Sequence, residues 1–281
     1  MTSKNQEHPE DFELDEAVNT KFDQMFQVQY FAPEKMLDLD EKDLGLEELK
    51  CLAEWETFPE VEKLYISNNQ LTDAAIQTLE NVSGNLQSIY LNHNLLGDDA
   101  ARSLARSEWV KPLKCLMLEA NNITAEGVKA LAESKHFQNL EELFLDFNPI
   151  GAEGVKMLAE SPNFPKLKAL HLDSTQMGDA GAVALAHSKT LTGIERLYLC
   201  SNRIGNEGAL ALSRSENLGT LRVLSIWRNE IRDEGGKAMI ASGTFDNLER
   251  LYMSLNLMDP PVIKQIRNSD LARRLVTLVM D

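Results

Sequence analysis

One repeating register runs through most of this chain and limits what it can fold into. With Leu140, the first residue of "LEELFLDFNPIGAEGVKMLAES", as position 1, the same pattern restarts at seven other places. Those starts are Val61, Leu86, Leu113, Leu167, Ile194, Leu221 and Leu248. With Leu140 included, the first interval between starts is 25 residues and every later interval is 27. A period of this length is typical of a protein built by stacking one supersecondary unit.

Each unit changes its hydrophobic period partway along. Apolar residues at positions 4 and 6 alternate with polar ones, which predicts a short strand buried on one face. Position 15 is small in nearly every unit and position 19 is apolar, a spacing typical of a helix. Between them, position 9 is Asn in every unit except the one with Thr175. An Asn amide can bond backbone groups left unpaired by a bend, so we expect a strand, a turn and a helix from each unit.

Stacking such units predicts a curved α/β architecture. Neighbouring strands lie about 4.8 Å apart, whereas packed helices need about 8–10 Å. The helices must therefore splay on a convex face while a parallel sheet lines the concave face, with right-handed connections. Leu37 and Leu39 fit a degenerate strand one period upstream, and "LVTLVM" from Leu275 fits one downstream.

The pattern "LxxLxLxxNxIxxEGxxxLAxS" resembles the leucine-rich repeat of the ribonuclease-inhibitor-like subclass. The resemblance covers Glu34 to Asp281 and implies a right-handed horseshoe solenoid. Members of that family are mostly protein-binding scaffolds, although one branch, the Ran GTPase-activating proteins, stimulates a GTPase. The chain departs from the pattern at Thr175, in its short first unit, and at Arg232 and Asp259, where other units carry Gly or Thr. At Thr175 we expect a local change in the turn.

Two parts of the chain are expected on this basis. Residues 1–33 read as an acidic N-terminal tail and a helical cap at about 13–30, because apolar residues from Leu14 to Phe26 recur at helical spacing and Pro33 follows. Residues 34–281 read as the solenoid, with eight clear repeats of 25–27 residues and degenerate end units. We expect a monomer, with pairing of the apolar last strand into a dimer as the alternative.

Charge and composition exclude several classes of partner. The chain has 28 basic and 44 acidic side chains, a formal charge of −16, which opposes binding to nucleic acid or anionic membranes. No apolar run approaches the thickness of a bilayer. Cys51, Cys115 and Cys200 show no paired spacing and fit a reducing compartment. We expect a soluble cytoplasmic protein that holds no cofactor and no metal.

The side chains that the sheet turns toward solvent predict a binding surface. Position 5 is mostly aromatic, and Tyr and Trp often dominate protein interfaces, although aromatic residues also favour strands in general. The predicted partner-binding residues at positions 5, 7 and 8 are Tyr65, Tyr90, Met117, Glu119, Phe144, Asp146, Phe147, His171, Asp173, Tyr198, Trp227, Arg228 and Tyr252.

Three acids lie side by side in this predicted surface. Glu119, Asp146 and Asp173 would be about 5 Å apart on adjacent strands. Because like charges repel, a Lys or Arg from a partner could bind among them and against Phe144, which predicts a partner protein with a basic element. A solvated acidic face without a partner is the alternative, and a metal site is a weaker one, since no ligand loop accompanies the acids.

The sequence contains no motif for enzyme chemistry of its own. No GxxxxGK[ST], HExxH or GxSxG motif occurs. The favoured function is therefore a non-enzymatic scaffold for protein–protein interaction. The alternative is a GTPase-activating protein resembling the Ran GTPase activators, which would need an exposed residue on a strand–helix loop to assist phosphate chemistry. Arg203, Arg228 and Arg232 are the candidates for that role.

Overall fold

A single curved sheet extends from Tyr30 to Val279. The computed structural model describes residues 21–280, and its sheet has eleven strands in the order of the sequence. Every neighbouring pair is parallel except β1 and β2, which are antiparallel. The strands are β1 (Tyr30–Phe31), β2 (Met36–Asp38), β3 (Lys63–Tyr65), β4 (Ser88–Tyr90), β5 (Cys115–Met117), β6 (Glu142–Phe144), β7 (Ala169–His171), β8 (Arg196–Tyr198), β9 (Val223–Ser225), β10 (Arg250–Tyr252) and β11 (Thr277–Val279).

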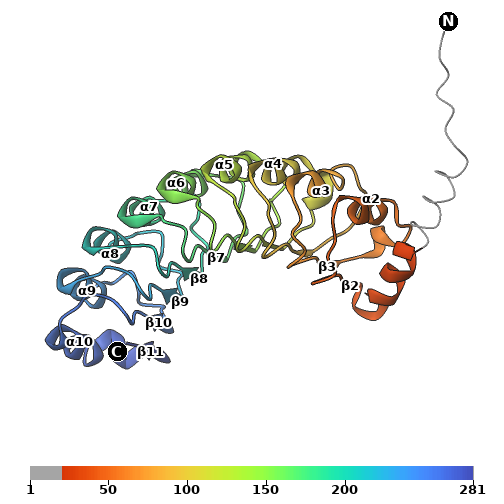
Figure 1. Ribbon diagram of the computed structural model, residues 1–281. Helices are drawn as coiled ribbons and strands as arrows, with labels where there is room; N and C mark the ends of the chain where they lie inside the picture. Colours follow the sequence, from red (N-terminus) through yellow and green to blue (C-terminus); the bar gives the residue numbers. More distant parts are fainter. Residues whose placement is uncertain (1–20, 281) are drawn as a thin grey trace, which may run out of the picture.

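The helices form an outer layer. In Figure 1 they follow the convex side of an arc whose inner side is the sheet. The α-helices are α2 (Leu46–Glu54), α3 (Asp73–Gln77), α4 (Asp98–Arg106), α5 (Ala125–Glu133), α6 (Gly151–Glu160), α7 (Gly178–Ala186), α8 (Asn206–Ser213), α9 (Asp233–Ile240), α10 (Pro260–Arg267) and α11 (Asp270–Arg274). Short 3-10 helices are Ala32–Glu34, Phe58–Glu60 and Glu108–Val110. The predicted α/β solenoid, with a parallel sheet inside the curve, is confirmed.

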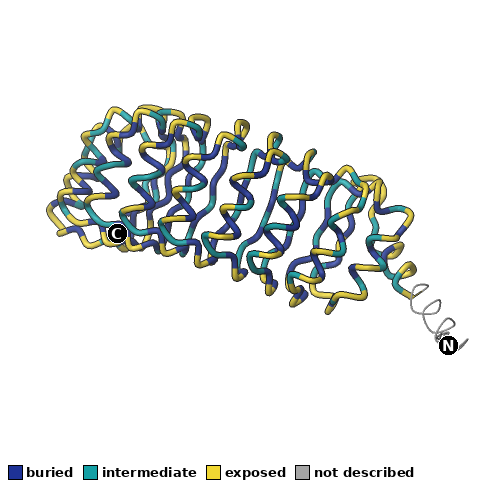
Figure 2. Tube along the Cα trace, turned by 90° about the horizontal axis from the view of Figure 1, so that it is seen from above, coloured by how far each residue is buried: buried dark blue, intermediate teal, exposed yellow. Residues whose placement is uncertain are grey.

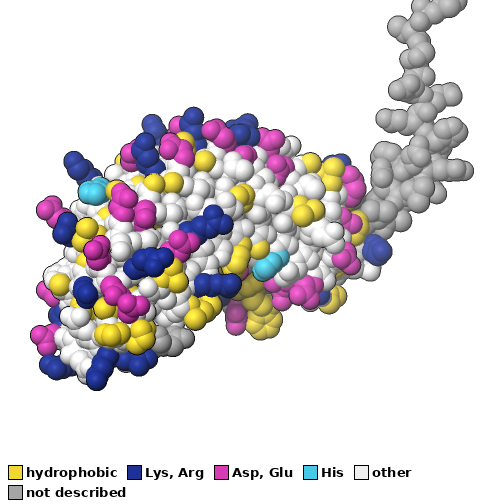
Figure 3. Space-filling model, turned by 60° about the vertical axis from the view of Figure 1, so that its left-hand side comes forward, with side chains coloured by type: hydrophobic (Ala, Val, Ile, Leu, Met, Phe, Trp, Pro, Cys, Tyr) yellow, Lys and Arg dark blue, Asp and Glu magenta, His cyan; other side chains and the backbone are white. Residues whose placement is uncertain are grey.

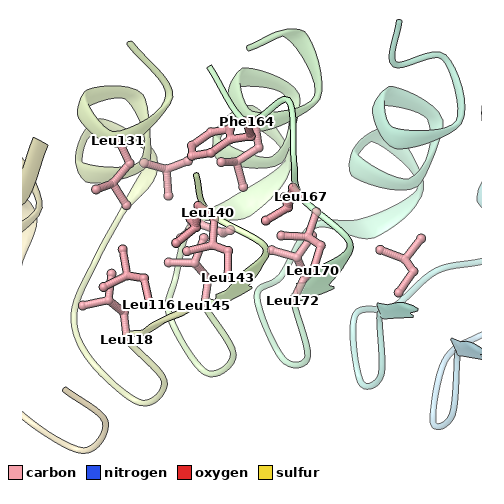
Figure 4. Close-up of a cluster of buried hydrophobic side chains, with 14 of the residues drawn as sticks. Leu116, Leu118, Leu131, Leu140, Leu143, Leu145, Phe164, Leu167, Leu170 and Leu172 are labelled. Carbon is pink, nitrogen blue, oxygen red and sulfur yellow. The ribbon is translucent and has the colours of Figure 1, made fainter. Parts of the chain in front are cut away.

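The core consists of ladders of identical positions. Leu143 at the centre of β6 is paired with Leu116 on one side and Leu170 on the other, and all three are buried. Figure 4 shows these side chains with those of Leu145, Phe164 and their neighbours between the sheet and the helices. In Figure 2 the buried segments run through successive coils while the exposed ones lie at the turns. Burial of this apolar surface is the main term that favours the stack, at roughly 25 cal/mol per Å².

The asparagine column joins each coil to the one before it. Asn121 is typical: its Oδ1 accepts the N–H of Leu96 at 3.0 Å, and its Nδ2 donates to the carbonyls of Leu91 and Leu118, both at 3.0 Å. With 5% of its surface exposed, Asn121 satisfies backbone groups that water cannot reach. Position 8 directly precedes this Asn or Thr in each unit. Its residue has a left-handed φ of 52–57° in every unit from Asn68 to Leu255.

Thr175 changes the turn of the preceding coil and leaves the stack intact. The Thr175 hydroxyl donates to the Leu172 carbonyl at 2.9 Å, but it offers no amide oxygen to the N–H of Ile150. That N–H instead donates to the Asn148 carbonyl at 2.9 Å, and Gly151 donates to the Thr175 carbonyl at 2.9 Å. Gly151 has a φ of 63°, a conformation that glycine adopts without strain. Gly178 has the same arrangement, with a φ of 56° and a bond to the Asn202 carbonyl at 3.0 Å, so only the bond of the Ile150 N–H is particular to Thr175.

Helix starts are connected from one coil to the next by position 13. The Asp98 carboxylate, at the start of α4, accepts the N–H groups of Thr124 at 2.8 Å and Gly127 at 2.9 Å, at the start of α5. Asp179 does the same for Gly205 and Gly208 of the following coil, at 2.7 and 2.8 Å. A negative side chain at a helix N-terminus satisfies unpaired donors and complements the helix dipole.

Helix ends are connected through the serine at position 22. The hydroxyl of Ser161 donates to the Ala132 carbonyl of the preceding coil at 2.6 Å, and Ser188 donates to Ala159 at 2.6 Å. Both serines are buried. They are structural residues, as their place near helix ends suggests.

The two ends of the stack differ. Residues 21–29 are helical, and Phe26 is fully buried against the first coils; the rest of the cap predicted at 13–30, and the acidic tail, lie outside the described residues. At the other end Val276 and Val279 of the last coil are 76% and 42% exposed. No helix within residues 21–280 combines the length and apolar character that crossing a bilayer requires.

Candidate functional site

Aromatic rings stack along the concave face. The registry pairs Phe144 with His171 and His171 with Tyr198. Their ring centroids are 3.8 and 4.1 Å apart, with interplanar angles of 24° and 16°. A second stack joins Tyr65 to Tyr90 at 4.0 Å and 8°. Because these residues occupy the last position of their strands, the short strand spacing brings the rings face to face.

The two stacks form one row with a break near its end. Met117 lies between Tyr90 and Phe144 in the registry. Beyond Tyr198 the same position is Ser225, a buried side chain, and the aromatic series resumes at Tyr252. The row of large side chains is therefore continuous from Tyr65 to Tyr198, with Met117 separating its two aromatic stacks.

Partial burial changes the acid–base behaviour of this row. Desolvation, with a smaller contribution from the positive charge of Arg196, lowers the pKa of His171 to about 4. The imidazole is thus neutral at physiological pH and acts as an aromatic ring in the stack. Burial also raises the pKa values of Tyr90 and Tyr198, so both phenols stay protonated.

The acids at position 7 are held more tightly than the sequence suggests. The Asp146 carboxylate accepts the N–H of Asp173 at 2.6 Å, and Asp173 accepts the N–H of Cys200 at 2.6 Å. Asp146 is only 6% exposed, whereas Glu119 and Asp173 are half-buried. The expectation of three solvent-facing carboxylates is therefore wrong for Asp146. The strand ends at position 5, so the alternation of faces no longer holds at position 7.

Burial sets the charge of this acidic row. The pKa of Asp146 is raised to about 7, mainly by desolvation and to a smaller extent by the nearby carboxylates of Asp173 and Glu119, against the lowering effect of its hydrogen bond with the Asp173 N–H. Desolvation also raises the pKa of Asp173. Near neutral pH the row holds fewer than three full negative charges, and a cation brought close to it would favour ionisation of Asp146.

An ion pair crosses the concave face beside the aromatic row. Arg196 on β8 reaches Glu142 on β6 with 2.6 Å between Nη2 and Oε1. The intervening residue on β7 is Ala169, which leaves the space above it open. This pair was not among the residues predicted from the sequence. In the sequence, Glu142 and Arg196 occupy position 3 of two units, and the small residue Ala169 occupies position 3 of the unit between them.

Loops after the strands carry the most exposed apolar side chains of the predicted site. Phe147 is 56% exposed after β6, and Trp227 is 37% exposed after β9, next to Arg228. Leu255 and Leu257 add exposed apolar surface one coil further on. The surface turned to the viewer in Figure 3 otherwise intersperses acidic and basic side chains.

The predicted site residues thus fall into three groups and a row of acids. Tyr65, Tyr90 and Met117 occupy the first part of the row, and Phe144, His171 and Tyr198 occupy its centre. The third group is on the last coils and in the loops: Phe147, Trp227, Arg228 and Tyr252. Glu119, Asp146 and Asp173 run beside the central group.

Hollows on the convex side lack this concentration of aromatic residues. Two of about 560 and 550 Å³ lie against α7, one toward α8 and one toward α6, and His187 borders both. Alanine and charged side chains line most of each. Within the described part of the chain no cluster of His, Cys, Asp or Glu has the arrangement to hold a metal ion. The concave face is therefore the stronger candidate site.

Comparison with known families agrees with the geometry. A family described as Leucine Rich repeat matches residues 111–132, 136–159, 165–186, 191–213 and 219–239. These segments cover five successive coils, which contain the helices α5 to α9. No curated protein matches the sequence.

Proposed function

Because the chain is a leucine-rich repeat protein of the ribonuclease-inhibitor type, a family whose members are generally protein-interaction scaffolds, we propose that it binds a partner protein on its concave face without catalysing a reaction. The observation that carries the proposal is the partly exposed stack of Phe144, His171 and Tyr198. Rings already held in position lose little conformational entropy when a partner covers them.

The acidic row supports a partner with a basic element. Asn92 occupies the same position as Asp146, and its amide oxygen accepts the N–H of Glu119 at 3.0 Å. An amide therefore satisfies the same backbone donor without the cost of burying a carboxylate. Keeping carboxylates at Asp146 and Asp173 has a physical reason if a Lys or Arg of the partner approaches them. Phe144 is near enough in the row to add a cation–π contribution.

Capture from lysate tests this proposal. The full chain and a Tyr198→Ala/Trp227→Ala variant would serve as bait, with crosslinking before mass spectrometry. The control is Lys129→Ala/Glu133→Ala, because both residues are exposed on α5 of the convex side. We expect the concave variant to lose a protein that the wild type and the control retain. If all three folded proteins capture the same set, the concave face is not the binding surface.

GTPase activation is the alternative function. Arg203, Arg228 and Arg232 are exposed on loops between strands and helices, and none of them forms an ion pair with another residue in the described range. An arginine in such a place could stabilise charge in the nucleotide site of a partner. GTP turnover by candidate GTPases, measured with and without the protein, separates the two functions. Stimulation that is lost on substituting one of these arginines would favour the activator, and no stimulation of any GTPase would exclude it.

A further inference from the structure

A polar hollow lies where β7, β8 and β9 pass into their loops. Its volume is about 470 Å³. It is lined by Ser174, Ser201, Arg203, Arg228, Asn229 and Glu230. The lining thus combines two guanidinium groups and two hydroxyl groups with a single carboxylate.

The two arginines are available to a ligand. Two other arginines of these coils are neutralised within the protein: Arg196 pairs with Glu142 at 2.6 Å, and Arg222 pairs with Glu249 at 2.6 Å. Arg203 and Arg228 are exposed, and neither is in an ion pair or a side-chain hydrogen bond with any residue between 21 and 280. With Glu230 as the one acid in the lining, the hollow has an excess of positive charge in a protein whose net charge is −16.

The backbone beneath these side chains is fixed. Asn229 is 5% exposed, and its Oδ1 accepts the N–H groups of Asn202 at 2.9 Å and Ile204 at 3.0 Å. Its Nδ2 donates to the Leu199 carbonyl at 2.9 Å. Four of the lining residues have a left-handed φ of 55–59°, namely Ser174, Ser201, Arg203 and Arg228. The donors therefore start from loops whose conformation is already set, which reduces the entropy lost on binding.

We propose that this hollow binds a phosphate monoester carried by the partner protein. The inference rests on the proposed function, since the phosphate belongs to the protein that the concave face binds. A phosphate group carries a charge of about −1.5 to −2 at pH 7 and has three strong acceptor oxygens. Two guanidinium groups and two hydroxyl groups offer donors to all three oxygens, and together with Glu230 the lining has a net charge of +1, which attracts the phosphate. A carboxylate has one negative charge and two oxygens, so it uses this set of donors less completely.

The neighbouring acids specify the rest of the partner. Ser174 directly follows Asp173, at the end of the acidic row. A phosphate in the hollow would therefore lie next to the surface proposed to accept a basic side chain. The partner segment should carry a Lys or Arg close to its phosphorylated residue, so that each charge meets its opposite on this protein.

Inorganic phosphate is the probe for the site. The full chain would be titrated with phosphate at constant ionic strength while the side-chain Nε–Hε resonances of Arg203 and Arg228 are followed by NMR, with acetate as the comparison anion. We expect saturable shifts of both resonances with phosphate and much weaker binding of acetate. Because inorganic phosphate loses its second proton near neutral pH and then carries more negative charge, binding should strengthen between pH 5.5 and pH 7.5.

Variants identify the donors. Arg203→Gln/Arg228→Gln should weaken phosphate binding by about tenfold or more, the loss expected for removing charge-assisted hydrogen bonds. Arg232→Gln is the matched control, because Arg232 is exposed on the same loop between β9 and α9 as Arg228 but does not line the hollow. Equal binding of acetate, the absence of saturable shifts, or unchanged binding in the folded double variant would each overturn the proposal.

The titration needs no partner, so its failure is distinct from failure of the proposed function. A protein that captures its partner through Tyr198 and Trp227 but does not bind phosphate contradicts only the phosphate site. A protein that binds phosphate but shows the same captured set in all concave variants contradicts the concave surface.

Discussion

The Asp146 carboxylate accepts the backbone N–H of Asp173 at 2.6 Å while only 6% of Asp146 is exposed. Burial raises the pKa of Asp146 from 3.8 to about 7. The folded protein therefore holds this proton more tightly than the unfolded chain. Between about pH 4 and pH 7 the contribution of Asp146 to stability should fall as the pH rises, because ionisation of Asp146 in that range favours the unfolded state.

Asp146→Asn should stabilise the protein at pH 8 and have little effect at pH 4. The amide keeps an acceptor for the Asp173 N–H, as Asn92 does for Glu119, and it removes the buried charge. Each pKa unit corresponds to about 1.4 kcal/mol, so the gain in unfolding free energy has an upper limit of about 4 kcal/mol. Urea unfolding at the two pH values measures it. A variant that is equally or less stable at pH 8 would contradict the burial argument.

Asn121→Ala should be strongly destabilising. It leaves the N–H of Leu96 and the carbonyls of Leu91 and Leu118 without the amide that now bonds them. Unsatisfied buried polar groups cost about 1–3 kcal/mol each, and partial relaxation suggests a total loss of about 2–4 kcal/mol. Asn139→Ala is the control, because Asn139 is largely outside the core and bonds one carbonyl, that of Lys111. Chemical unfolding of both variants compares them, and equal losses would mean that the asparagine column is not special.

The repeat made most of the fold predictable. A period of 27 fixes which residues become neighbours, so the registry of Phe144 with Met117 and His171 follows from counting. The Asn column likewise predicted the turn, and Thr175 its local change. The helix-start bonds made by position 13 were not predicted, although Asp98 and Asp179 occupy that position in their units. Their role depends on helix starts of adjacent coils meeting, a relation that the pattern of one unit does not contain.

The candidate site was predictable only as far as the strands extend. Alternation of faces is a property of extended backbone, and it holds through position 5, where the aromatic rings lie. At position 7 the chain has already begun to turn, so Asp146 is buried against the next coil. It also could not be predicted that Arg203 and Arg228 form no ion pair with another residue between 21 and 280. Ion pairing depends on how far side chains reach across several coils.

Gly127→Ala tests the close contact between successive helices. A Cβ at this position would lie 2.5 Å from Asp98 Oδ1 and 2.8 Å from Ile123 Cγ2. Because Asp98 is held by bonds to Thr124 and Gly127, it cannot withdraw without losing them. We expect a loss of about 1–3 kcal/mol in unfolding free energy, despite the higher helix propensity of alanine. Gly219→Ala, where a Cβ would meet no atom within 4 Å, should change stability by about 0.5 kcal/mol or less.

His171 offers a direct measurement of the aromatic row. Its pKa is lowered to about 4, mainly because Phe144 and Tyr198 cover both faces of the imidazole and remove it from water. Phe144→Ala should admit water to one face and raise the pKa toward 6.5, the ordinary value for histidine. NMR titration of the ring C–H resonances measures the shift. Phe147→Ala is the control, since Phe147 is exposed in the loop beyond the strand and outside the stack, and it should leave the pKa of His171 low. A wild-type pKa near 6.5 would mean that the rings are not closely stacked in solution, and the preformed surface on which the proposed function depends would then be lost.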